Sequence, residues 1–342
     1  MAPLHLTLLV FGLILSSHIL SILGVRYLPR LNLVDFPGSE SHKHHLNPVP
    51  LGGGLIIFTL VLLLKLFFNE ELDFLNLYFF GAATIIFILG LWDDMHSLKP
   101  KIKLIGQIVS SLIIFLGGYR VELFNISVID GLITFIWIIG IINSFNLLDG
   151  GDGLATGIVI IITFSLSILS LLISMQENLF LASIAVCAIC MGIYINNKRP
   201  AKIFLGDSGA QLLGLILSVF ALYFAPVGYY RSTSWIVPIL IFLLPIFDVT
   251  LVVYSRIKRK VPVFQGGLDH TYHRLLARTR SHESTSMIIF FSVFILNVLS
   301  LITLIVIPFF GFLIFFTVML LFIIIINKME SSFLIHGNDH TR

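Results

Sequence analysis

The sequence predicts an all-α protein, a polytopic bundle of about eleven transmembrane helices. The chain of 342 residues is 57% hydrophobic and only 11% charged, whereas a soluble domain carries about 25% charged residues. This deficit of charge, together with a mean hydropathy of +1.02, indicates that most of the surface faces lipid. Apolar runs recur along nearly the whole chain, which favours one continuous membrane domain over separate soluble domains.

Eleven apolar runs come close to the roughly 17–25 residues that a helix needs to cross a bilayer. The first run could be read as a signal peptide, but it lacks a basic start and a small-residue cleavage site, so we interpret it as a helix. The expected spans are 4–25, 51–68, 77–92, 103–118, 130–148, 154–174, 178–196, 209–228, 235–255, 287–307 and 309–327. We assign residues 1–327 to one integral membrane domain and 328–342 to a short cytoplasmic tail.

The basic residues predict how the bundle is oriented, because cytoplasmic loops are enriched in Lys and Arg. All but three of the 21 basic residues fall in the loops and tail on one side; the exceptions are Lys65, Arg120 and Arg231. We therefore expect the N-terminus outside and the C-terminus in the cytoplasm.

The two cysteines, Cys187 and Cys190, form a CxxC pair inside an apolar run. Such a pair can indicate redox or zinc chemistry, but no second pair accompanies it. We interpret the two cysteines as small residues on one helix face.

Acidic residues also gather on the predicted cytoplasmic side, and topology does not explain them, because acids contribute little to orientation. The aspartates there are Asp35, Asp93, Asp94, Asp149, Asp152, Asp207, Asp248 and Asp269. We predict a functional site at these helix ends. A transporter with an inner acidic site is an alternative from another class, but it would place polar residues through the depth of several helices.

Asp93 and Asp94 end the third predicted span, and Lys103 follows at the start of the next. Neighbouring helical residues point about 100° apart, so the two carboxylates need not share a ligand. We expect one to bind and the other to orient Lys103 or act as a base, and the sequence leaves open which does which.

The segment from Asn143 to Leu154 is the richest in polar groups. Asn143 and Asn146 lie on one helix face, and Asp149 and Asp152 follow among three glycines. Glycine lets backbone approach a ligand closely. Two carboxylates in such a turn suit a metal ion, or the hydrogen-bond donors of a base or sugar, while their spacing does not match a calcium loop.

Asp207 follows Gly206 at the expected start of a helix, where free N–H groups favour anions. An acid and a phosphate together suggest a bridging Mg²⁺, which takes one or two carboxylates, waters and substrate phosphates. A simple helix N-cap is the alternative.

Asp248 lies about seven residues before its span ends at Arg256, roughly 10 Å inside the polar boundary. An ionised carboxylate there costs several kcal/mol unless it is paired or lines a wet cavity. We predict substrate binding, with a structural pair to Arg or Lys as the alternative. The loop from Arg256 to His282 mixes basic residues with three histidines and suits phosphates. Nucleic acid is not expected as a partner, because these basic residues are simply close to the membrane.

Taken in order, these segments resemble the polyprenyl-phosphate N-acetylhexosamine-1-phosphate transferases, glycosyltransferase family 4, which include phospho-N-acetylmuramoyl-pentapeptide transferase. The resemblance spans about residues 33–285. It rests on 90–94 with Lys103, on 143–154, on 200–214 and on 245–248. Segment 45–54 resembles the corresponding motif of the O-antigen-initiating members, and so does the pattern His270-Thr-Tyr272 with its later Ser-His pair. Many other relatives carry an HxHH motif here, with a histidine at the position of Tyr272.

The resemblance implies transfer of an N-acetylhexosamine 1-phosphate from a UDP-sugar to undecaprenyl phosphate, with release of UMP. The product would start O-antigen or another cell-envelope glycan at the cytoplasmic face of the bacterial inner membrane. The implied cofactor is Mg²⁺, with Mn²⁺ as a substitute. The implied partners are the UDP-sugar, undecaprenyl phosphate and the bilayer, and a homodimer is left open. Peptidoglycan-type transfer from UDP-N-acetylmuramoyl-pentapeptide is the alternative, and Tyr272 argues against it.

The resemblance also implies roles for individual residues. Asn146 and Asp207 are expected to hold the metal, Asp93 to deprotonate or orient the lipid phosphate, and Asp94 to orient Lys103. The expected catalytic set is Asp93, Asp94, Lys103, His270 and Arg274. The expected substrate-binding set is His45, Asn143, Asp149, Asp152, Asn197, Asp248 and His273, with Asp149 and Asp152 meeting the uridine.

Overall fold

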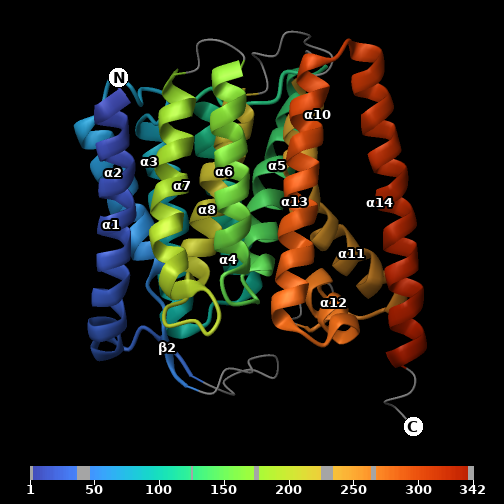
Figure 1. The fold of residues 1–342 in the computed structure, drawn as a ribbon, viewed down its shortest axis with the longest axis horizontal. Helices are drawn as coiled ribbons and strands as arrows, with labels where there is room; N and C mark the ends of the chain where they lie inside the picture. Colours follow the sequence, from blue (N-terminus) through green and yellow to red (C-terminus); the bar gives the residue numbers. More distant parts are fainter. Residues whose placement is uncertain are drawn as a thin grey trace. The chain divides into compact units, whose positions relative to one another are not determined.

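The computed structural model describes residues 3–36, 47–124, 126–172, 177–224, 234–262 and 267–337, with side chains as far as 331. These residues are almost entirely helical (Figure 1). The chain forms two compact units, Met1–Val227 and Gly228–Arg342. The assignment of residues 1–327 to one membrane domain stays a prediction.

Eight helical segments of the described chain are long and apolar enough to cross a bilayer, which confirms the predicted class of a polytopic helical membrane protein. They are α1 (Pro3–Tyr27, continued by the 3-10 turn η1, Leu28–Leu31), α3 (Leu77–His96), α5 (Ser127–Leu148), α6 (Leu154–Leu172), α7 (Glu177–Asn197), α8 (Gly206–Phe224), α13 (His282–Ile305) and α14 (Pro308–Gly337). Their orientation across the membrane stays a prediction.

The other three expected spans are shorter or broken helices. α2 (Gly53–Phe67) has 15 residues and α4 (Pro100–Leu116) has 17. The expected span 235–255 is split into α10 (Ile236–Ile241) and α11 (Leu243–Arg259), which meet at Phe242. Pro245 has no N–H to donate to the carbonyl of Ile241, so the helical hydrogen-bond ladder is interrupted at this point.

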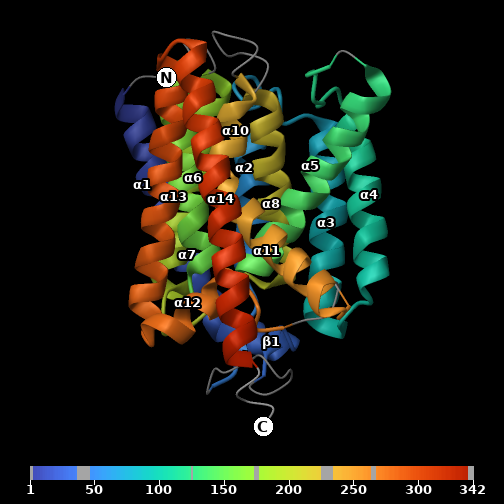
Figure 2. The ribbon, with the colours of Figure 1, turned by 90° about the vertical axis from the view of Figure 1, so that its right-hand side faces the viewer.

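Within the first unit, α8 is the central helix. It packs against α2, α3 and α5, while α7 packs against α1 and α6. Figure 2 shows α3, α4 and α5 side by side. α8 is the most enclosed of the candidate spans, with 89% of its apolar window buried. At Gly54 and Gly90 the neighbouring helices approach so closely that a Cβ would lie 2.4 Å from an atom of Ser208.

A small sheet precedes α2. β1 (Val34–Asp35) pairs antiparallel with β2 (Val49–Pro50). The chain that follows β2 then hydrogen-bonds to Phe204 and Leu205, through the N–H groups of residues 52–54. These bonds tie the start of α2 to the start of α8. The segment 37–46, which contains the predicted site residue His45, lies outside the described residues.

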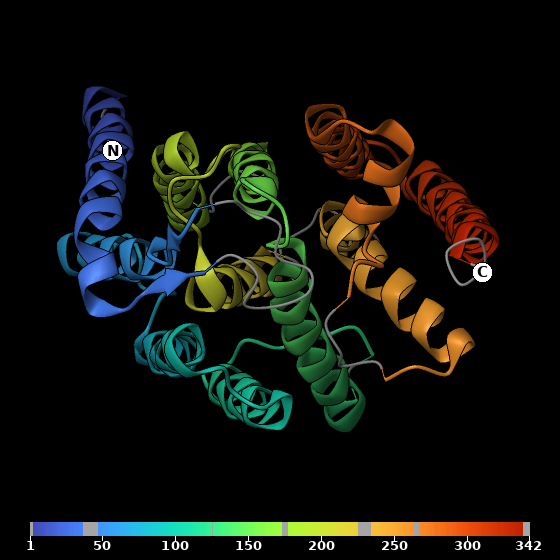
Figure 3. The same cartoon turned by 90° about the horizontal axis from the view of Figure 1, so that it is seen from below.

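Within the second unit, α10 packs against α13 and α11 packs against α14. In Figure 3 the long helices α13 and α14 are seen roughly down their axes, whereas α11 runs across the view. A further helix, α12 (Thr271–Thr279), lies where the sequence analysis expected only a loop. Leu275 of α12 packs against a buried cluster that includes Phe247 and Met329. A nine-residue helix of mixed polarity is too short to stand out as an apolar run, and this tertiary packing stabilises it.

Candidate active site

Lys103 lies between two carboxylates at the end of the first unit where α3 ends and α4 and α8 begin. Its Nζ is 2.5 Å from Asp93 Oδ2 and 2.5 Å from Asp207 Oδ2. The three side chains are between 11% and 28% exposed, so the two ion pairs are only partly screened by water. The structure thus brings together three residues that the sequence predicted for one site.

Asp94 caps the N-terminus of α8. Its Oδ1 accepts a hydrogen bond from the backbone N–H of Asp207 at 2.7 Å, and its Oδ2 accepts from the backbone and the hydroxyl of Ser208 at 3.2 and 2.6 Å. The expectation that Asp94 orients Lys103 is therefore wrong. Neighbouring helical positions point about 100° apart, so Asp93 reaches the lysine and Asp94 reaches α8.

Gly206 allows the Asp94 carboxylate to lie close to the backbone at the start of α8. Its φ of +72° suits glycine, and a Cβ at this position would lie 2.6 Å from Asp94 Oδ2. The glycine that the sequence analysis placed beside Asp207 therefore serves both the backbone turn and the cap.

A chain of buried amides leads from Asp207 into the first unit. Gln211 Nε2 donates to Asp207 Oδ2 at 3.3 Å, and Gln107 Nε2 donates to Gln211 Oε1 at 3.2 Å. Asn143 closes the chain, because its Nδ2 donates to Gln107 Oε1 at 2.7 Å. Asn143, predicted to bind substrate, is thus held by protein groups, and that binding role stays a prediction.

Sequence reasoning missed Gln107 and Gln211. The sequence contained a signal for them. Gln107 lies four residues after Lys103, and Gln211 lies four residues after Asp207, so each glutamine is on the same helix face as a predicted site residue. Both glutamines are only 2% exposed.

Asn146, Asp149 and Asp152 follow one another around the end of α5, near Asp207. Asn146 is within hydrogen-bonding reach of Asp207, and its buried Oδ1 accepts no hydrogen bond from any described residue. Burial raises the pKa of Asp149 well above its usual value, and the negative charges of Asp207, Asp94 and Asp152 raise it further. This concentration of carboxylates favours a bound cation.

Asp152 and Asn197 hold the loop that leads into α8. Asp152 Oδ2 accepts a hydrogen bond from the N–H of Ala201 at 3.2 Å. Asn197 accepts from the Thr156 hydroxyl at 2.6 Å and donates to the carbonyl of Ile203 at 2.8 Å. These contacts give Asn197 a structural role, and its predicted binding role stays a prediction.

The second unit contains a buried pair formed by Asp248 and His270. Asp248 Oδ2 lies 3.0 Å from His270 Nδ1, and Oδ1 accepts from the N–H of Thr271 at 2.6 Å. From the sequence, Arg or Lys was the alternative partner of this carboxylate; in the structure the partner is a histidine at the start of α12.

Tyr272, the departure from the commoner histidine motif, is also paired. Its hydroxyl lies 2.7 Å from His282 Nδ1. His273 packs edge to face against the rings of His270 and Tyr272. The late histidines therefore form one contiguous cluster around α12.

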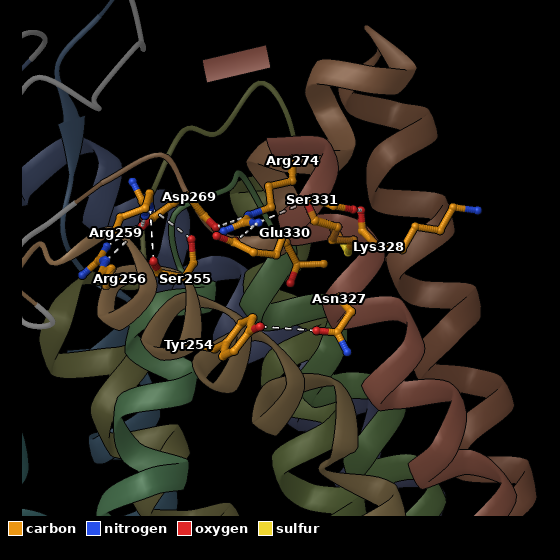
Figure 4. A network of polar contacts seen from close by, with 12 residues as sticks. Tyr254, Ser255, Arg256, Arg259, Asp269, Arg274, Asn327, Lys328, Glu330 and Ser331 are labelled. Atoms are coloured by element: carbon orange, nitrogen blue, oxygen red, sulfur yellow. Dashed lines mark hydrogen bonds and ion pairs between the residues drawn. The ribbon is translucent and has the colours of Figure 1, made fainter. Parts of the chain in front are cut away.

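Two arginines of α11 enclose Asp269 (Figure 4). Arg256 donates to both carboxylate oxygens at 2.8 and 3.0 Å, and Arg259 donates to Oδ2 at 2.5 Å. Burial would raise the pKa of Asp269, but the two arginines outweigh it and lower that pKa to about 2. Asp269 thus joins α11 to the start of α12.

Arg274, predicted to meet a phosphate, lies in a buried ion pair with Glu330 of α14 (Figure 4). Its Nη1 is 3.0 Å from Glu330 Oε2, and its Nε donates to the carbonyl of Asp269 at 2.7 Å. The side chains of the pair are 3% and 1% exposed. The phosphate role of Arg274 stays a prediction, and Glu330 carried no sequence signal because its partner lies 56 residues away.

The donor set around Asp207 fits a magnesium ion. Asp207 offers a carboxylate, and the buried Oδ1 of Asn146 offers an amide oxygen that no described residue uses. Within the described ranges, no three His, Cys, Asp or Glu side chains are arranged to hold a metal by themselves. Mg²⁺ does not need such a cage, because it keeps waters and substrate phosphates as ligands.

The sequence also matches known proteins. Residues 76–225 match the model of the glycosyl transferase family 4 proteins. The probable undecaprenyl-phosphate N-acetylglucosaminyl 1-phosphate transferase of Bacillus subtilis (strain 168) is 32% identical over 286 residues, covering 79% of this chain and 76% of that protein.

Two further relatives show the range of the similarity. The decaprenyl-phosphate N-acetylglucosaminephosphotransferase of Mycobacterium leprae (strain TN) is 27% identical over 298 residues, covering 76% of this chain and 74% of that protein. A phospho-N-acetylmuramoyl-pentapeptide-transferase of Prochlorococcus marinus (strain MIT 9312) is 34% identical over 226 residues, covering 58% of this chain and 63% of that protein. The matched part of the chain contains the whole acidic site of the first unit.

Proposed function

The chain belongs to glycosyltransferase family 4, and on that premise we propose that it transfers an N-acetylhexosamine 1-phosphate from a UDP-sugar to undecaprenyl phosphate. An oxygen of the lipid phosphate attacks the phosphorus that bears the sugar. The bond from that phosphorus to the bridging oxygen breaks, UMP leaves, and a lipid diphosphate sugar forms. The observation that carries the proposal is the Asp93–Lys103–Asp207 cluster, which lies inside the family match.

Such a reaction brings a phosphate and a diphosphate together, so catalysis depends on positioning and on neutralising negative charge. Lys103 supplies a cation held by two helices besides its own. A phosphate monoester has a second pKa of about 6, so the lipid phosphate is mostly ionised at neutral pH. We therefore assign Asp93 mainly to orienting the acceptor; it takes a proton only from the minor fraction of acceptor that is still protonated.

Magnesium is the cofactor we propose for this site, held by Asp207 and Asn146. When bound, it would withdraw charge from the diphosphate. The unused Oδ1 of Asn146, beside the Asp207 carboxylate, supports this choice.

We propose that Asp149 and Asp152 recognise the uridine part of the donor. No described residue donates a hydrogen bond to the Asp149 carboxylate, so that group is available for the N–H of a base or the hydroxyls of a ribose. His270 is proposed to meet a phosphate of one of the substrates.

We further propose that the site faces the cytoplasm and that the product starts O-antigen or another cell-envelope glycan. The position of nearly all basic residues on one side of the predicted bundle supports this orientation. A site at the membrane surface suits the reaction, since one substrate dissolves in water and the other in lipid.

A transfer assay tests the proposal. The purified full-length chain in detergent is given radiolabelled UDP-GlcNAc and undecaprenyl phosphate, and the lipid-soluble label is counted with and without EDTA. We expect transfer that EDTA abolishes and excess Mg²⁺ restores. Asp207→Asn is expected to abolish transfer, whereas Asp130→Asn, a buried carboxylate in the first turn of α5, serves as the control.

A donor screen separates the proposed function from its nearest rival. UDP-GlcNAc, UDP-GalNAc, UDP-QuiNAc, UDP-FucNAc and UDP-N-acetylmuramoyl-pentapeptide are compared under the same conditions. Transfer from the muramoyl pentapeptide alone would favour the peptidoglycan-type reaction, to which the similarity with the Prochlorococcus marinus protein points. Absence of transfer from every donor would refute the proposal.

A further inference from the structure

The second unit contains a buried carboxylate and imidazole, Asp248 and His270, that are paired across 22 residues of sequence. We infer that Asp248 is a positioning residue that acts through His270, holding the imidazole so that Nε2 is presented to a substrate phosphate. The inference rests on the proposed function and assigns Asp248 a task that needs no contact with substrate, in place of the substrate binding that the sequence predicted.

Both oxygens of Asp248 are already engaged by the protein. Oδ2 lies 3.0 Å from His270 Nδ1, and Oδ1 accepts the N–H of Thr271 at 2.6 Å. The residue is only 1% exposed and lies in the second turn of α11. A carboxylate so deeply buried is costly unless its hydrogen bonds are made, and these two bonds make it part of a fixed framework.

The bond to Asp248 determines which nitrogen of His270 carries a proton. An ionised carboxylate only accepts hydrogen bonds, so Nδ1 must be the donor. Nε2 then remains on the opposite side of the ring, and no described residue hydrogen-bonds to it. As part of an imidazolium, Nε2 donates to a phosphate oxygen.

The charged and titratable groups around His270 are consistent with this task. The carboxylate of Asp248 lies 3.0 Å from Nδ1, and the carboxylate of neighbouring Asp269 is held by Arg256 and Arg259. The ring of His273 lies edge to face at 6.2 Å between centroids.

The contact with Thr271 adds rigidity. It ties the first residue of α12 to α11, so the backbone on the C-terminal side of His270 is fixed by the same carboxylate that holds the ring. A misplacement of a catalytic group by about 1 Å can lower the rate by about 10²-fold. A carboxylate that fixes both the ring and its backbone therefore determines the direction in which Nε2 points.

A double-mutant cycle tests whether Asp248 acts through His270. The variants are Asp248→Asn, His270→Gln and the double variant, assayed as full-length protein for kcat of sugar-1-phosphate transfer. We expect Asp248→Asn to lower kcat by about 10²-fold when His270 is present. In the His270→Gln background the same substitution is expected to change kcat by less than about twofold, because residue 248 then has no imidazole to position.

Asp130→Asn is the matched control. Asp130 is also a buried carboxylate that accepts two backbone N–H groups, at 3.0 and 3.3 Å, but none of its contacts involves a histidine. Its substitution is expected to have the same effect on kcat in both backgrounds. A spectroscopic readout accompanies the kinetics: ¹⁵N NMR of labelled histidine, with His270→Gln for assignment, is expected to show Nδ1 of His270 protonated and this preference weakened by Asp248→Asn.

The outcomes are distinct. Losses that multiply in the double variant, with active wild-type protein, would overturn the inference and leave the proposed function intact. A wild-type chain that transfers sugar-phosphate from no donor would overturn the proposed function, and the inference with it. If Asp248→Asn does not fold, as judged by size-exclusion chromatography, Asp248→Ser replaces it, since a hydroxyl also accepts the Nδ1 proton but carries no charge.

Discussion

Replacing Gly90 by alanine tests the idea that close helix packing places the carboxylates of the site. A Cβ at residue 90 of α3 would lie 2.4 Å from Ser208 Cα, 2.6 Å from Ser208 N and 2.9 Å from the carbonyl carbon of Asp207. Carbon atoms in contact normally stay about 3.5–4.0 Å apart, so the start of α8 must move away by about 1 Å. All three atoms are backbone, so no side-chain rotation can relieve the overlap.

The displacement has two consequences. Overpacking of this kind costs about 1–3 kcal/mol of stability. It also separates Asp94 from the N–H groups of Asp207 and Ser208, and it moves the Asp207 carboxylate relative to Lys103. Because a misplacement of about 1 Å can cost about 10²-fold in rate, we expect Gly90→Ala to lower kcat by about that factor.

The measurement compares two alanine variants of the same helix. Gly81→Ala is the control, because a Cβ at Gly81 meets only Ile113 at an ordinary 3.8 Å. We expect Gly81→Ala to retain the wild-type rate and melting temperature. A Gly90→Ala protein with wild-type kcat and melting temperature would refute the link between this packing and the site.

Three further predictions concern the groups around Asp207. Lys103→Met is expected to lower kcat at least about 10²-fold, because the carboxylates 2.5 Å from Nζ lose their shared cation; exposed Lys101→Met is the control, and equal rates for the two variants would contradict the assignment. Gln211→Leu removes the donor to Asp207 Oδ2 and leaves Gln107 Nε2 without its acceptor on Gln211. We expect thermal unfolding to show a loss of about 1–3 kcal/mol in stability. We also expect a lower kcat with an unchanged KM for the UDP-sugar donor. Asn146→Ala is expected to weaken binding of Mn²⁺, measured by electron paramagnetic resonance, and unchanged Mn²⁺ affinity would remove Asn146 from the metal site.

The membrane class and most helices follow from the sequence, because hydropathy is a local property of each run. The apolar stretches predicted α1 and α5–α8 to within a few residues. The split of the expected span 235–255 and the presence of α12 did not follow. A break at Phe242 and a nine-residue helix depend on local backbone bonds and on packing against neighbours, which hydropathy does not record.

In the candidate site, too, the sequence predicts some features and the packing of the helices decides others. The types and order of the residues were enough to predict that Asp93, Lys103 and Asp207 belong together, because each ends or begins a helix on the same side. Which carboxylate meets the lysine was not predictable, since it depends on how α3 is rotated against α8. The family resemblance implied Asp94, and the structure gives that contact to Asp93.

Pairings between distant residues are the part that the folded chain alone establishes. Asp248 could be recognised from the sequence as a buried carboxylate that needs a partner, since an unpaired charge inside a membrane helix is costly. Its partner His270 lies 22 residues away on another element, and the partner of Arg274 lies 56 residues away on α14. Composition and spacing determine which groups need a partner, while the packing of helices determines which partner each group meets.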